Sequence, residues 1–190
     1  MRIKDEAKQK ALFEATIKVV NRIGFASSSV SQIATEAGVS PATLYVYYKD
    51  KKDLLISTYT EIKLCLGEEM IKGFDDSLPI RDIIFNAWVN AFHYISRHRD
   101  YLNFIEQFAH SPYADEVDKT EIEKNYEPLI KTIQQGIEQK IIKDVELELL
   151  SMFIFQPILI LANQRIYSDF ELNRKNIEKA FNLAWDAIKF

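Results

Sequence analysis

The chain has 190 residues, of which 47% are hydrophobic and 27% charged, a balance typical of a folded globular protein. Its 5 Gly and 5 Pro supply too few turns for a sandwich or barrel of many short strands. The single cysteine, Cys65, excludes an intramolecular disulfide framework and a cysteine-based zinc site.

The net charge of −4 conceals an asymmetry along the chain. Residues 1–55 carry nine Lys and Arg against six Asp and Glu, a balance of +3, whereas residues 56–190 carry 15 against 22, a balance of −7. A basic segment on an acidic body indicates nucleic-acid binding only weakly, because such a balance is also common on solvated surfaces. The charge asymmetry alone therefore does not establish nucleic-acid binding, and a sequence motif is needed as well.

The sequence has no recognisable targeting or membrane segment. The first ten residues are charged and contain no apolar run, unlike a secretory signal. The most apolar stretch, residues 149–162, is interrupted by Gln156 and Pro157 and has 14 residues, whereas a membrane-spanning helix needs about 20. We therefore expect a cytoplasmic protein that does not associate with membranes.

Apolar residues recur at intervals of three and four along most of the chain, as in Leu12, Ala15, Val19 and Ile23, which predicts amphipathic helices. No segment alternates between apolar and polar residues for long enough to predict a sheet. The expected fold class is all-α, with about nine helices over residues 5–22, 30–37, 41–48, 51–72, 79–96, 100–110, 114–140, 145–168 and 172–189.

Capping residues mark the first helices. Gly24 is placed to stop the first helix, and the serines at 27–29 offer N-cap oxygens to the second. Gly38 then provides the turn, Ser40 the next N-cap, and Pro41 the first helical position, where its missing N–H does no harm. Two short helices joined by a tight glycine turn after a longer helix form a helix-turn-helix.

The third helix is suited to the major groove of DNA. Ile33, Val39 and Leu44 are spaced to hold it against the first helix, and Tyr48 is expected to join that core. The positions that face outward carry small or hydrogen-bonding side chains, namely Ser40, Pro41, Ala42, Thr43, Tyr45 and Tyr47. Three lysines follow around the start of the fourth helix, where main-chain N–H groups also favour a phosphate: Lys49, Lys51 and Lys52.

Residues 24–55 contain the sequences VSQIA (30–34), AGVS (37–40) and TLYVYY (43–48), followed by Lys51. This stretch closely resembles the TetR family of one-component transcriptional regulators. The remaining 135 residues match the family only in length, helical pattern and two long terminal helices. The resemblance implies an N-terminal three-helix DNA-binding head over residues 1–50 and a helical effector-binding and dimerisation body over residues 51–190.

The resemblance also implies DNA contacts at individual positions. Ser29 and Tyr47 would contact phosphates, and Lys51 would hold the DNA backbone from the fourth helix. The full implied set is Ser29, Ser40, Pro41, Ala42, Thr43, Tyr45, Tyr47 and Lys51. Ser29 can also serve purely as a helix cap, and Tyr45 can pack inside. Val46 departs from the family pattern, because many members carry His at that position.

Aromatic residues of the body indicate a ligand pocket, although such stripes more often form a core. A mostly apolar cavity with a few polar groups is the usual small-molecule site. We expect a lipophilic effector, aromatic or acyl in type, to contact Trp88, Phe92, Phe104, Phe108, Tyr126, Phe155 and Gln156. Pro157 should kink its helix, which either opens space for the ligand or adjusts packing.

Residues 147–161 are apolar almost all round, so a helix there must be buried on every side. In a chain this small, one buried face is expected to belong to a second subunit. We therefore expect a homodimer formed through residues 145–189 as a four-helix interface. The alternative is a monomer that covers both faces itself.

The sequence shows no recognisable catalytic or metal site. His98, Arg99 and Asp100 match the start of a kinase catalytic loop, but its later Asn and the Gly-rich loop are missing. The three histidines lack zinc-ligand spacing, and Cys65 is expected to be a buried thiol. We expect no enzymatic activity, no cofactor and no metal.

Together the resemblance and these patterns imply a repressor that binds a palindromic operator in double-stranded DNA and is released by a small lipophilic effector. The alternative is a helical small-molecule binding protein or enzyme that retains a vestigial DNA-binding head. Salt-sensitive, sequence-selective binding of duplex DNA distinguishes the two.

Overall fold

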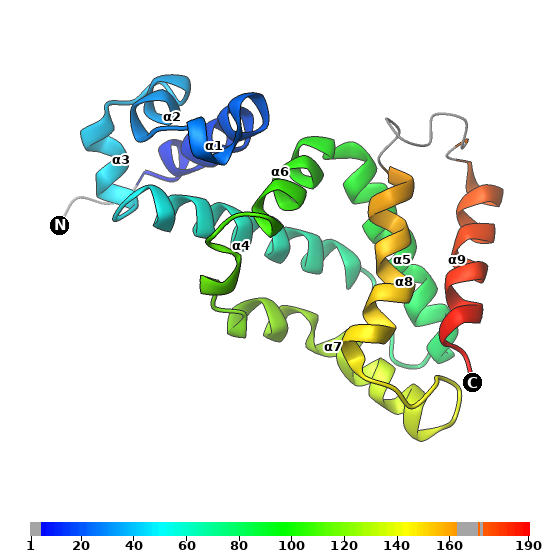
Figure 1. Cartoon of the computed structure of the whole chain (residues 1–190). Coiled ribbons are helices and arrows are strands. Elements are labelled where there is room, and N and C mark those ends of the chain that lie inside the picture. Colours follow the sequence, from blue (N-terminus) through cyan, green and yellow to red (C-terminus); the bar gives the residue numbers. More distant parts are fainter. Residues whose placement is uncertain (1–4, 163–170, 172) are drawn as a thin grey trace. The chain divides into compact units, whose positions relative to one another are not determined.

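The structure is a computed structural model that describes residues 5–162, 171 and 173–190. These residues form nine α-helices and no β-strand (Figure 1), which confirms the all-α class. The helices are α1 (Glu6–Ser27), α2 (Val30–Glu36), α3 (Pro41–Tyr47), α4 (Lys51–Met70), α5 (Ile80–Arg97), α6 (Arg99–Ala109), α7 (Thr120–Glu138), α8 (Leu147–Ala162) and α9 (Arg174–Ile188). A 3₁₀ turn, η1 (Ala114–Glu116), lies between α6 and α7.

The first helix differs from its expected extent. Its assigned range continues to Ser27, but Gly24 interrupts it with a non-helical conformation (φ 80°, ψ 165°). The Gly24 stop was therefore predicted correctly, and a short second helical piece follows it. At the other end, Asp5 caps α1 by accepting a hydrogen bond from the main-chain N of Ala7 at 3.0 Å.

The later helices are shorter than expected. Residues 114–140 contain η1 and α7 rather than one helix, because the backbone at Val117 is extended (φ −71°, ψ 124°). α8 passes through Pro157 as one helix and α7 through Pro128. The expected end of the eighth helix at 168 and the start of the ninth at 172 lie outside the described residues.

The chain forms two compact units. The first comprises Met1–Lys63 and Asp100–Lys119, and the second comprises Leu64–Arg99 and Thr120–Phe190. α4 contributes to both, with residues 51–63 in the first unit and 64–70 in the second. This division follows packing, whereas the expected functional division at residue 50 stays a prediction.

The first unit has two clusters of buried side chains. One joins α1 to the helix-turn-helix and consists of Leu12, Ala15, Val19, Ile33, Ala34, Leu44, Tyr48 and Leu54. The other joins α1 to α4 and α6 and consists of Phe13, Ile17, Val20, Leu55, Ile62, Phe104 and Phe108. α1 is thus packed on more than one side, which holds α2 and α3 on a rigid base.

The second unit packs α5 against α7, α8 and α9. Trp88 of α5 is fully buried, and its indole Nε1 donates to the main-chain oxygen of Ile154 in α8 at 2.8 Å. Its ring stacks on Phe92 and meets Phe181 of α9 edge-on. The described helices include none that is both long and apolar enough to cross a lipid bilayer.

Candidate nucleic-acid interface

The turn between α2 and α3 is built from the residues that the sequence indicated. The N–H of Ala37 donates to the oxygen of Ile33 at 2.9 Å, and Gly38 adopts a positive φ of 68°. The N–H of Val39 then donates back to the oxygen of Ala34 at 2.9 Å. Because Ala34 is fully buried and small, α3 can leave the turn close to α2.

The two predicted N-cap serines both act as caps. The Oγ of Ser29 accepts from the N of Gln32 at 3.3 Å and donates to the Oε1 of Gln32 at 2.8 Å. The Oγ of Ser40 accepts from the N of Thr43 at 3.1 Å and lies 2.9 Å from its Oγ1. Both serines are exposed, so capping leaves the hydroxyls accessible to a phosphate, and their DNA contacts stay predictions.

The outward face of α3 is open. Pro41 and Ala42 are exposed, Thr43 is half-buried, and Tyr45 and Val46 are 55% and 45% exposed. Of the two conformations considered for Tyr45, the structure therefore has the outward one. Val46 belongs to this face although it was not among the expected contacts. Its position four residues after Ala42 was the available signal, because such residues share a helix face.

The paired tyrosines at the end of α3 have different environments. Tyr48 is buried as expected, and burial, with the nearby carboxylates of Glu61 and Asp53, raises the pKa of Tyr48 to about 12. Tyr47 is half-buried, and its hydroxyl accepts from the N of Asp5 at 3.0 Å and donates to the Asp5 oxygen at 3.3 Å. Tyr47 therefore ties the start of α1 to the end of α3.

The lysines around the start of α4 are not equivalent. The Nζ of Lys51 donates to the main-chain oxygen of Phe25 at 2.6 Å, and partial burial lowers the pKa of Lys51. Lys52 pairs with Glu116 at 2.7 Å, and this hydrogen bond raises the pKa of Lys52. Lys49 is exposed. Only Lys51 of the three reaches back to the segment that precedes α2, which the sequence did not predict.

The residues expected to hold an effector lie in both units. Phe104 and Phe108 are buried in the first unit. The other five belong to the second unit, where Trp88 and Phe92 are buried, Tyr126 and Phe155 half-buried and Gln156 exposed. Their assembly into one site stays a prediction. Among the described residues, no three His, Cys, Asp or Glu side chains gather as metal ligands.

Comparison with known proteins decides the family. Residues 12–58 match the model "Bacterial regulatory proteins, tetR family", and residues 84–189 match "Tetracyclin repressor-like, C-terminal domain". The chain belongs to the TetR family. A TetR-family transcription regulator from Marinobacter aquaeolei VT8 is 34% identical, with a TM-score of 0.88 over 100% of this chain and 99% of that one.

Two other transcriptional regulators extend the comparison. An uncharacterised helix-turn-helix transcriptional regulator from Haemophilus influenzae is 21% identical over 94% of both chains. FadR from Bacillus subtilis, solved in complex with stearoyl-CoA, is 20% identical, with a TM-score of 0.72 over 93% of this chain and 95% of that one. The protein is therefore a DNA-binding transcriptional regulator of the TetR family, and these relatives are named as regulators rather than enzymes.

Proposed function

We propose that this protein is a repressor that binds a palindromic operator as a homodimer and is released from it by a small lipophilic effector. The observation that carries the proposal is the open outer face of α3. Buried Ile33, Ala34 and Leu44 fix the helix from behind, while small and hydrogen-bonding side chains stand outward. Such a face suits entry into a major groove and contact with base edges.

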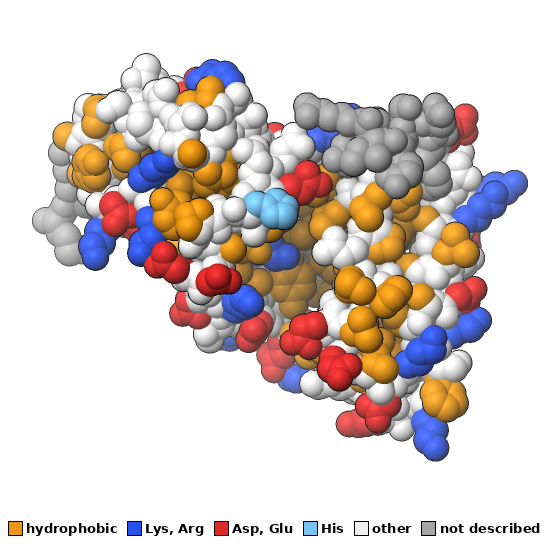
Figure 2. All heavy atoms as spheres, in the orientation of Figure 1, with side chains coloured by type: hydrophobic (Ala, Val, Ile, Leu, Met, Phe, Trp, Pro, Cys, Tyr) orange, Lys and Arg blue, Asp and Glu red, His pale blue; other side chains and the backbone are white. Residues whose placement is uncertain are grey.

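The second unit supports dimerisation through α8 and α9. Four large apolar side chains of α8 are more than a third exposed, namely Leu149, Met152, Phe153 and Ile160. Leu183 of α9 is 74% exposed. Figure 2 shows hydrophobic side chains gathered over these helices. An apolar face of this kind favours burial against a second copy, because contiguous apolar patches mark interaction surfaces.

A two-fold dimer predicts the form of the operator. Each copy would present one α3, so the operator would be an inverted repeat with half-site centres about 34–36 Å apart or a multiple of that. Phosphate contacts from Lys51 and neighbouring groups would make the affinity fall steeply with salt.

The effector proposal rests on the aromatic residues of the body. Buried Trp88 and Phe92 and half-buried Tyr126 and Phe155 supply apolar surface, and Gln156 supplies a polar group. The complex of FadR with stearoyl-CoA supports an acyl-type effector, because the fold of FadR is similar to that of this chain. Since α4 belongs to both units, an effector that shifts α4 would change the separation of the two α3 helices. Ligand and DNA affinities would then be reciprocally coupled, by about 1–3 kcal/mol.

Selection from random duplex DNA at about 0.15 M salt tests the DNA-binding function. The expected result is an enriched inverted repeat for the wild type and none for Ala42→Asp, which places a negative charge on the outer face of α3. Ala109→Asp is the matched control, because Ala109 is also exposed and lies in the same unit. No enrichment with the wild type, or equal enrichment by Ala42→Asp, contradicts the proposal.

A screen for release of the selected operator then tests the effector site. With an effector in hand, Trp88→Ala and Phe155→Ala should change the concentration needed for release while operator affinity stays within about threefold. A normal response of both variants contradicts the proposed effector site and leaves the DNA-binding function intact.

A further inference from the structure

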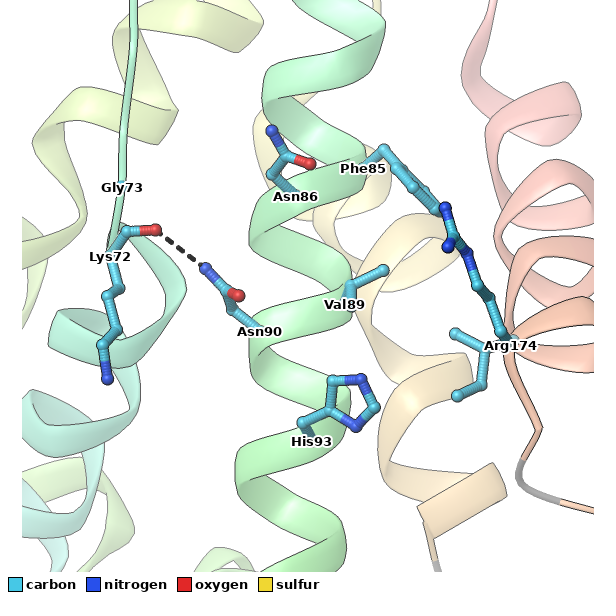
Figure 3. Close-up of a pocket in the computed structure, with 9 residues that line it drawn as sticks. Lys72, Gly73, Phe85, Asn86, Val89, Asn90, His93 and Arg174 are labelled. Carbon is cyan, nitrogen blue, oxygen red and sulfur yellow. Dashed lines mark hydrogen bonds between the residues drawn. The ribbon is translucent and has the colours of Figure 1, made fainter.

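The second unit contains a half-open pocket of about 460 Å³ on the outer face of α5 (Figure 3). The segment that follows α4, with Lys72 and Gly73, lies along one side, and the start of α9, with Arg174, lies along the other. The described lining includes none of the seven residues expected to hold the lipophilic effector. The pocket is therefore a separate candidate site.

The pocket has an apolar half and a polar half. Phe85, Val89 and Ile177 provide apolar surface between α5 and α9, on the side of Arg174. Asn86 and Asn90, one helical turn apart, point toward the Lys72 side. A ligand that matches both halves must be amphipathic, with an apolar body and a polar end.

The polar half has a fixed framework. The amide Nδ2 of Asn90 donates to the main-chain oxygen of Lys72 at 3.0 Å and to that of Met70 at 3.4 Å. Met70 is the last residue of α4 and Lys72 follows it, and main-chain oxygens at the end of a helix have no hydrogen-bond donor within the helix. Asn90 thereby holds the end of α4 against α5, so the wall of the pocket is already formed without a ligand.

The charge of the described lining has one sign. Lys72 and Arg174 are cationic, and none of the described lining residues is acidic. The Nζ of Lys72 lies 2.6 Å from the carboxylate of Glu69, but Lys72 is 73% exposed in this pair. The Glu69 side chain is half-buried, but the lysine end is open to solvent, so the pair contributes little free energy and the ammonium can turn to a bound anion.

We propose that this pocket binds a small amphipathic anion, a carboxylate or phosphate monoester on a short apolar body. The apolar body lies on Phe85, Val89 and Ile177. Arg174 borders the apolar half and reaches the anionic group from that side, because its planar guanidinium matches a carboxylate or phosphate through two parallel hydrogen bonds. Lys72 adds a second positive charge from the opposite side of the pocket. The proposal does not depend on DNA binding, since the pocket lies within one unit and its occupancy can be measured directly.

The test is calorimetric titration of the full chain with octanoate, octyl phosphate and neutral octanamide. At least one of the anions should bind with a Kd of about 1 mM or tighter, and at least about tenfold more tightly than octanamide. The stronger of the two anions identifies the head group. Arg174→Ala should lower the affinity for that anion at least about fivefold without changing the affinity for octanamide. Lys72→Ala should lower the affinity for the anion less.

Lys175→Ala is the matched control, because Lys175 is the adjacent exposed cation of α9 and does not line the pocket. It should bind the anion as the wild type does. Octanamide binding as tight as octanoate, equal affinities of Arg174→Ala and wild type, or no anion binding up to about 10 mM would each overturn the proposal. If the anion bound elsewhere in the body, Arg174→Ala and wild type would have equal affinities, because such binding would not require Arg174.

Discussion

The ammonium of Lys51 and the main-chain oxygen of Phe25 lie 2.6 Å apart. The same oxygen accepts a hydrogen bond from the hydroxyl of Ser28 at 2.8 Å. Lys51 begins α4, whereas Phe25 and Ser28 precede α2, so this oxygen joins two segments that flank the helix-turn-helix. Lys51 therefore has a structural bond in addition to its proposed phosphate contact, and the two roles make different predictions.

Replacing Lys51 by Met removes the charge and keeps most of the aliphatic stem. The stability cost should be about 0.5–1.5 kcal/mol, because Ser28 still satisfies the Phe25 oxygen. Operator affinity should fall at least about tenfold, and the slope of log affinity against log salt should lose about one unit. Fluorescence anisotropy at several salt concentrations measures the operator affinity and its salt slope.

Lys52→Met is the matched control, because Lys52 pairs with Glu116 and lies on the neighbouring position of α4. Its effect on affinity should be smaller than that of Lys51→Met. If Lys51→Met lowered the affinity but left the salt slope unchanged, the purely structural role would be the correct one.

Alkaline pH should destabilise the first unit through Tyr48. Its pKa is about 12 in the fold against about 10 unfolded, so the folded state retains a proton that the unfolded state loses. The stabilisation is fully present below about pH 10 and is lost as the pH rises to 12. The difference in unfolding free energy between wild type and Tyr48→Phe should change by on the order of 2 kcal/mol over this range.

Urea denaturation at pH 8, 10 and 11.5 or so gives this difference. The phenylalanine variant keeps the buried ring, so it removes the ionisable group with little change in packing. Tyr45→Phe is the matched control, because it makes the same substitution at an exposed position. Burial also raises the pKa of Tyr59, so the loss in Tyr48→Phe should be smaller rather than absent. Identical pH profiles for Tyr48→Phe and wild type would contradict this account.

Local signals in the sequence predicted most of the helix-turn-helix. Gly38, Ser40 and Pro41 each act within a few residues of their own position, and each does in the fold what its chemistry favours. The bond from Lys51 to Phe25 spans 26 residues and the bond from Trp88 to Ile154 spans 66. Such partners depend on how whole helices pack, and no local pattern specifies them.

The close approach of α4 and α7 should make Gly67 intolerant of a side chain. A Cβ there would overlap the Oδ1 of Asn125 and lie 3.0 Å from its Cγ and from the Cε2 of Tyr126. The Asn125 amide cannot easily move, because its Nδ2 donates to the oxygen of Leu64 at 3.2 Å. Gly67→Ala should therefore cost about 1–3 kcal/mol, even though alanine favours a helix by about 1 kcal/mol.

Gly136→Ala is the natural comparison within the same unit. Its Cβ would meet the Cδ1 and Cγ1 of Ile142 at 2.6 and 2.9 Å, and Ile142 is itself buried. The cost should be of the same order as at Gly67, because the gain in helix propensity is the same at both positions and both are crowded by neighbouring side chains. Adding Asn125→Ala to each variant should relieve Gly67→Ala and leave Gly136→Ala unchanged. Denaturation midpoints of these variants measure the costs, and a fully stable Gly67→Ala would contradict the steric account.

The exposed apolar face of α8 should be the site at which dimerisation can be broken. Phe153 is 48% exposed, and Phe153→Lys would place a positive charge on this face in both copies. Burying an unpaired lysine costs far more than the apolar contact returns, so the proposed dimer should dissociate. Sedimentation velocity should then show a species of about half the mass, and operator affinity should fall because only one α3 is presented at a time.

Phe74→Lys provides the control for a change from exposed phenylalanine to lysine. Phe74 is 39% exposed in the same unit but belongs to neither α8 nor α9. Its mass in solution should equal that of the wild type, which separates loss of the α8 face from a general effect of added charge. A wild type that sediments as a monomer would show that the proposed subunit contact does not exist. A Phe153→Lys variant that sediments with the mass of the wild-type dimer would place the contact elsewhere. Only a monomeric wild type would also remove the reason to expect a palindromic operator, since that expectation follows from two-fold symmetry alone.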